Sequence, residues 1–98
     1  KNLLKQAQQL QAHLDKIQGE LETEVIESSV GGGTVKVSCN GKQRVLSVSI
    51  DPEVVDPSDV GLLEDLVLSA INESMGKAQA LADERMRLAT GGLKLPGM

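Results

Sequence analysis

The chain has 98 residues, a length that fits a single domain spanning residues 1–98. It contains no Phe, Tyr or Trp, so the core must be aliphatic, and base stacking on single-stranded nucleic acid is excluded. The formal net charge is -4, and the single cysteine excludes an internal disulfide.

The first predicted element is an amphipathic helix over residues 1–22. Its apolar residues recur at alternating steps of four and three, the heptad pattern typical of a helix that packs against a partner helix. These residues are Leu3, Ala7, Leu10, Leu14, Ile17 and Leu21. Gly19 lowers helix stability by about 1 kcal/mol and marks a weak point near the end.

Residues 23–50 predict three antiparallel strands. Residues 23–30 are β-branched and polar, residues 31–33 are a triple glycine that predicts a loop, and residues 34–39 alternate. The alternation places Val35, Val37 and Cys39 on one buried face. A buried thiol in such a strand is a small hydrophobic group.

The third strand is predicted to return after a tight turn. Asn40 and Gly41 predict a type I′ hairpin, because both residue types tolerate the positive φ that this turn needs at its two central positions. In residues 42–50, Leu46, Val48 and Ile50 should point inward. The following Asp-Pro ends the strand, because proline cannot donate a ladder hydrogen bond.

A long second helix is predicted over residues 57–90, followed by a flexible tail over residues 91–98. Either Asp56, with proline next to it, or Ser58 can cap the start. Apolar residues then recur at steps of three and four without an interrupting proline. Gly91 and Gly92 should end the helix.

Two helices and three strands in so short a chain leave apolar faces uncovered, which predicts a homodimer. No stretch approaches the roughly 20 apolar residues of a membrane span, and the amphipathic start lacks the apolar block of a signal peptide. The expectation is therefore a cytoplasmic protein without a membrane partner.

Charge is divided unevenly along the chain. Residues 1–14 carry two lysines and no acid, and residues 85–98 carry three basic residues and no acid. The middle holds five basic and all fourteen acidic residues, a net -9. If the two helices pack antiparallel, the start of the first should lie beside the end of the second, so that both basic segments meet at one tip.

One stripe of the first helix is a candidate phosphate-facing edge, because 11 residues make almost three turns and the stripe avoids the apolar seam. It contains Lys1, Lys5, Gln8, Gln9 and Lys16. The same pattern also fits an ordinary solvated helix face.

The sequence predicts neither an enzyme nor a cofactor or metal site. His13 is the only histidine and stands in no catalytic motif, and one histidine with one cysteine is too few for a closed tetrahedral metal site. The triple glycine leads into a strand and lacks the Lys-Ser/Thr pair of a phosphate-binding loop. Adjacent helical carboxylates such as Glu64 and Asp65 point apart.

Several motifs resemble the YbaB/EbfC family across nearly the whole chain. They are GGGTVKVSCNGKQRVLSVSIDPEVVDP, with its Val-Lys-Val strand, Asn-Gly turn and Ile-Asp-Pro-Glu strand end, and LLEDLVLSAINES in the long helix. The resemblance implies an α+β fold, a tweezer-shaped homodimer, duplex DNA binding largely through the backbone, and a role in nucleoid organisation and gene expression. It implies no enzyme and no small-molecule substrate.

With that resemblance, the basic residues of both termini become the candidate DNA contacts. They are Lys1, Lys5, Lys16, Arg85, Arg87 and Lys94. The alternative is a dimeric scaffold or adaptor that uses the same helices to hold another protein, for which an acidic body serves equally well.

Overall fold

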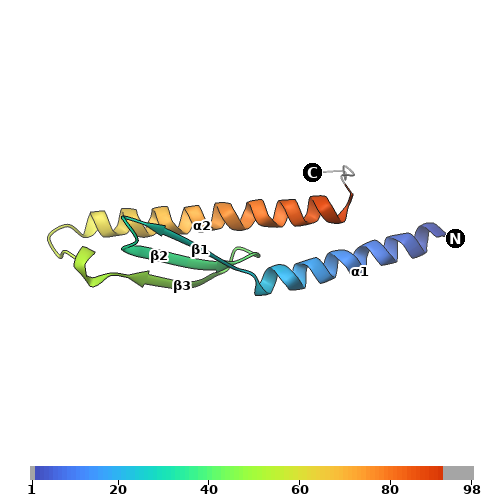
Figure 1. The fold of residues 1–98 in the computed structure, drawn as a ribbon, viewed down its shortest axis with the longest axis horizontal. Coiled ribbons are helices and arrows are strands. Elements are labelled where there is room, and N and C mark those ends of the chain that lie inside the picture. Colours follow the sequence, from blue (N-terminus) through green and yellow to red (C-terminus); the bar gives the residue numbers. More distant parts are fainter. Residues whose placement is uncertain (1, 92–98) are drawn as a thin grey trace.

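The computed structural model describes residues 2–91, so Lys1, Lys94 and the predicted tail beyond Gly91 lie outside the described residues. Figure 1 shows the α+β order that the sequence predicts. The elements are α1 (Asn2–Thr23), β1 (Val25–Val30), β2 (Val35–Asn40), β3 (Val45–Ile50), the 3-10 turn η1 (Pro52–Val54) and α2 (Val60–Ala89).

The three strands form one antiparallel sheet in the order β1-β2-β3, and α2 packs on β1 and β2 (Figure 1). The centre of the core is made by Val35 and Val37 of β2 and Ala70 of α2, all fully buried. Partly buried aliphatic side chains surround them, namely Val30, Val54, Leu63, Leu66, Val67 and Ile71. The predicted burial of the alternating strand is confirmed, including that of Cys39.

β3 has the predicted orientation without the expected burial. Val48 pairs with Val37 and Ile50 with Val35, so these side chains lie on the same face of the sheet as the core. Val48 is nevertheless 46% exposed and Ile50 is 37% exposed. Since α2 packs on β1 and β2, the apolar face of β3 is left uncovered in a single chain.

The β2–β3 turn differs from the predicted type I′ turn. Gly41 does not take a positive φ, whereas Gln43 does, at 62°. The Asn40 side-chain oxygen accepts hydrogen bonds from the backbone N–H groups of Lys42 and Arg44, which holds a longer turn. Gly41 is needed because no side chain fits at this position. Its N–H donates to the Leu21 carbonyl at 2.8 Å, and an added Cβ would lie 2.8 Å from that oxygen.

α2 begins later than predicted, at Val60, with Asp59 as its cap instead of Asp56 or Ser58. The Asp59 carboxylate accepts a hydrogen bond from the Leu62 N–H. The Asp56 carboxylate accepts hydrogen bonds from the hydroxyl and the N–H of Ser58, and these bonds lower the pKa of Asp56. They hold both residues in the turn before α2, so neither residue caps the helix. The helix ends as predicted before Gly91, whose φ is +64°.

α1 runs antiparallel to α2 but is shifted along it (Figure 1). Gln18 contacts Met86, so the end of α2 lies beside the middle of α1, and the prediction that it lies beside the start of α1 is wrong. Residues 2–13 are all exposed and extend past the end of α2; we call them the projecting arm. Among residues 2–91 no other element packs against the apolar seam of this arm, because α2 stops at Ala89.

Candidate nucleic-acid interface

The projecting arm carries no acidic residue, and its basic stripe continues to Lys16. Ile17 and Leu21, on the seam side of α1, are buried against the rest of the molecule. Lys5, Gln9 and Lys16 are exposed and lie on the opposite side of the helix, as their spacing predicts. The stripe therefore faces solvent over about 16 Å, taking 1.5 Å per residue from Lys5 to Lys16.

The two arginines of α2 are separated by the helix geometry. Residues two apart point in nearly opposite directions, and Arg87 is exposed while Arg85 is turned toward α1. Arg87 forms no ion pair within residues 2–91, and Asp83, four residues earlier, accepts a hydrogen bond from Gln79.

Arg85 is bound to the end of α1. One guanidinium nitrogen lies 2.8 Å from the Glu24 carboxylate and another lies 3.9 Å from that of Glu20. Sequence reasoning missed these partners, since 61 residues separate Arg85 from Glu24 and only the antiparallel packing brings them together. Lys1 and Lys94, the remaining predicted contacts, lie outside the described residues.

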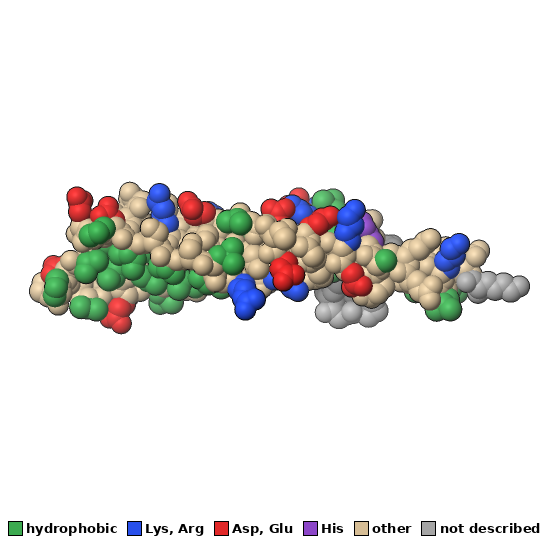
Figure 2. Space-filling model, turned by 90° about the horizontal axis from the view of Figure 1, so that it is seen from below, with side chains coloured by type: hydrophobic (Ala, Val, Ile, Leu, Met, Phe, Trp, Pro, Cys, Tyr) green, Lys and Arg blue, Asp and Glu red, His purple; other side chains and the backbone are tan. Residues whose placement is uncertain are grey.

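The distribution of charge favours the arm over the body as the place where a polyanion can bind. In Figure 2, acidic side chains lie along the body, whereas the outer part of the arm displays a basic side chain and no acidic one. An acidic body repels phosphate, and an arm that extends beyond it places Lys5 away from that repulsion.

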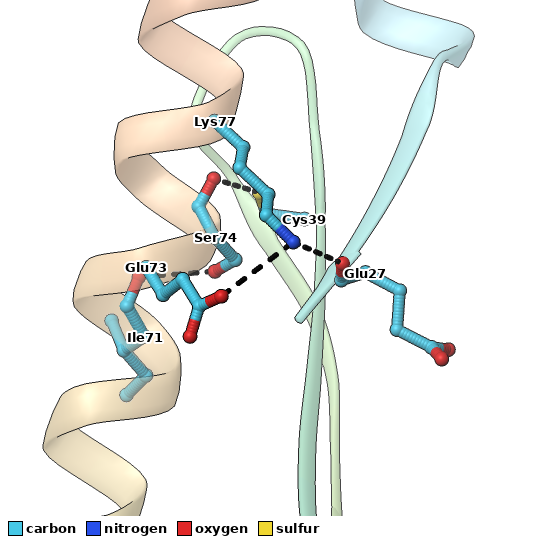
Figure 3. A network of polar contacts seen from close by, with 6 residues as sticks. All are labelled: Glu27, Cys39, Ile71, Glu73, Ser74 and Lys77. Atoms are coloured by element: carbon cyan, nitrogen blue, oxygen red, sulfur yellow. Dashed lines mark hydrogen bonds and ion pairs between the residues drawn. The ribbon is translucent and has the colours of Figure 1, made fainter. Parts of the chain in front are cut away.

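The polar contacts between helix and sheet are structural. The Cys39 thiol donates to the Ser74 carbonyl at 3.4 Å, and the Lys77 ammonium lies 3.3 Å from the Glu27 carbonyl and 3.7 Å from the Glu73 carboxylate (Figure 3). These contacts tie α2 to β1 and β2. Within residues 2–91 no three potential metal ligands come together, and none of the described helices has the length and apolarity to cross a membrane.

The sequence and fold match known proteins over nearly the whole chain. It is 48% identical to a nucleoid-associated protein of Clostridium novyi, with 99% of this chain and 85% of that protein covered. It is 50% identical to a nucleoid-associated protein of Chloroflexus aggregans, with 96% of this chain and 94% of that protein covered.

A crystal structure of an uncharacterized protein from Helicobacter pylori has the same fold, with a TM-score of 0.76, 22% identity and 94% of each chain covered. The model of the YbaB/EbfC DNA-binding family matches residues 1–93. With its helix, three-stranded sheet and long helix in that order, the chain belongs to the YbaB/EbfC DNA-binding family.

Proposed function

We propose that this protein binds duplex DNA as a homodimer, mainly through phosphate contacts from its arms, and so takes part in nucleoid organisation. The observation that carries the proposal is the exposed, acid-free stripe of Lys5, Gln9 and Lys16 on the outer side of α1. Membership of a DNA-binding family supports DNA as the partner.

The chemistry of the stripe favours backbone contacts over base reading. Lysine ammonium groups neutralise phosphates at any sequence, and glutamines add hydrogen bonds to phosphate oxygens. The chain lacks aromatic side chains that could stack on bases. Binding should therefore depend strongly on salt and weakly on sequence.

The uncovered face of β3 supports the homodimer. Four apolar side chains of this strand are exposed, namely Val45, Leu46, Val48 and Ile50. Figure 2 shows apolar side chains gathered on the half of the molecule that contains the sheet. β3 is also an edge of the sheet, with unpaired backbone groups. A second copy related by a twofold axis covers both patches at once, because each copy offers the same surface. Such a dimer carries two arms.

Titration of a labelled duplex at several salt concentrations tests the proposal. Replacing Lys5 and Lys16 by Ala should weaken binding to all duplexes, because the variant loses phosphate contacts. Each lost contact should also reduce the magnitude of the slope of log affinity against log salt by about 0.9. The matched control replaces Lys36 and Lys42, which belong to the sheet and its turn, and should leave affinity nearly unchanged.

A loss of affinity in the Lys36 and Lys42 variant alone would move the interface from the arm to the sheet. Absence of salt-dependent DNA binding by the unmodified protein would instead favour a scaffold that binds another protein.

A further inference from the structure

We propose that Arg85 is a positioning residue: by binding Glu24 and Glu20 it clamps α1 at a fixed angle and so presets the position of the basic stripe, and of Lys5 in particular, for DNA. This role rests on the proposed DNA-binding function. In it, Arg85 fixes the angle of the arm and does not itself contact a phosphate. The contacts that carry it are the ion pairs at 2.8 Å to Glu24 and 3.9 Å to Glu20.

The clamp lies where α1 joins the rest of the molecule. Glu24 stands between α1 and β1, and the other anchors of α1 are close by: Leu21 is buried, and its carbonyl accepts the Gly41 N–H. The Asn40 side chain donates to the Glu22 carbonyl. Ile17 is also buried, and Gln18 contacts Met86. All residues from Asn2 to His13 are exposed, so the angle of the arm is set by the contacts that residues 17–24 make.

A small rotation at the clamp becomes a large displacement at the arm. Lys5 lies 15 residues from Glu20, roughly 22 Å along the helix. A rotation of about 10° therefore moves Lys5 by about 4 Å, which is more than the 2.7–2.9 Å reach of a charge-assisted hydrogen bond to phosphate. Without the clamp, the arm must be ordered when DNA binds, and that ordering costs affinity.

The surroundings of Arg85 also disfavour a direct phosphate contact. Its side chain is only 33% exposed and faces two carboxylates, so the local charge is net negative. A phosphate at Arg85 would have to compete with the Glu24 carboxylate, which already accepts a hydrogen bond from the guanidinium. Arg87 has no such partner within residues 2–91 and is the appropriate control on the same helix.

Electron paramagnetic resonance distances in DNA-free protein test the clamp directly. Nitroxides at Gln6→Cys on the arm and Ser69→Cys on the exposed side of α2 report the arm angle, with Cys39 changed to Ala in every variant and labelled chain diluted into unlabelled chain. Arg85→Gln and Glu24→Gln should each broaden the distance distribution, and Arg87→Gln should leave it unchanged. An unchanged distribution in both clamp variants overturns the proposal.

DNA titrations of the same substitutions separate positioning from contact. If Arg85 positions the arm, Glu24→Gln should weaken DNA binding by about twofold to fivefold per arm, which is the strength of a partly exposed ion pair. The salt slope should stay unchanged, because no phosphate contact is lost. A direct phosphate contact predicts the opposite: Glu24→Gln frees the arginine and tightens binding, which would overturn the proposal.

Charge reversal gives a rescue. Arg85→Glu combined with Glu24→Arg keeps the total charge and can rebuild the pair, so it should restore both the narrow distance distribution and the affinity that Arg85→Glu alone loses. If the double variant has a narrow distance distribution but still binds DNA weakly, Arg85 contacts the DNA directly, and the proposal is overturned. If the unmodified protein binds no DNA, the proposed function fails, while the distance measurements still decide whether Arg85 holds the arm.

Discussion

At the scale of single residues, glycine has different tasks at different points of this chain. Gly31, Gly32 and Gly33 all adopt positive φ, between 61° and 89°, so the triple glycine is required by backbone conformation. Gly41 is required by space alone, because its backbone touches the end of α1. Gly76 lies in α2 with nothing within 4 Å of an added Cβ.

This contrast predicts opposite effects of one substitution. Gly76→Ala should raise the free energy of unfolding by about 0.5–1 kcal/mol, because alanine favours the helix and restricts the unfolded chain. Gly41→Ala should lower it, since its Cβ would lie 2.8 Å from the Leu21 carbonyl and force α1 away from the turn. Urea unfolding of both variants measures the difference, and equal effects would contradict the close approach at Gly41.

At the scale of the elements, α1 is one helix in two environments. Its apolar seam is continuous in the sequence, yet only the half near the sheet is packed: Leu21 is 1% exposed and Leu3 is 80% exposed. Isolated helices of about 12 residues are marginal in water, so the arm relies on continuity with the anchored half.

Alanine substitutions along the seam should therefore have unequal effects. Leu21→Ala should lower the free energy of unfolding by about 2–5 kcal/mol, because it leaves a cavity between α1 and the sheet. Leu3→Ala should change it by less than about 0.5 kcal/mol, since it removes an exposed side chain. Thermal melts compare the two, and a large effect of Leu3→Ala would mean that another chain covers the arm.

At the scale of the whole molecule, one chain does not bury its own apolar surface. The extents are 68 × 22 × 16 Å, and the radius of gyration is 18.4 Å, against about 13 Å for a compact chain of this length. The exposed β3 face is part of this excess surface. A dimer through β3 increases the buried apolar area without lengthening the chain.

Two neighbouring residues of β3 test that interface. Val48→Asp places a charge on the apolar face and should convert the proposed dimer into monomers, because a buried unpaired carboxylate is costly. Ser49→Asp places the same charge on the opposite face of the same strand and should leave the dimer intact. Light scattering at micromolar concentration reads out both masses, and a dimer in both variants would place the interface elsewhere.

The sequence by itself determined the type and order of the two α-helices and three strands, and which faces of β2 and β3 are apolar. Those features follow from local periodicity, turn residues and caps within a few neighbouring positions. It also predicted the stripe of Lys5 and Lys16, because helical spacing alone puts residues 11 apart on one side.

Only the tertiary structure decided the position of α1 along α2. That position makes the arm project and brings Arg85 to Glu24. Only it showed that Gly41 serves a close contact and that α2 leaves β3 uncovered. These features depend on contacts between residues 20 to 68 positions apart. Packing of side-chain volumes fixes those contacts, and local sequence patterns do not encode it.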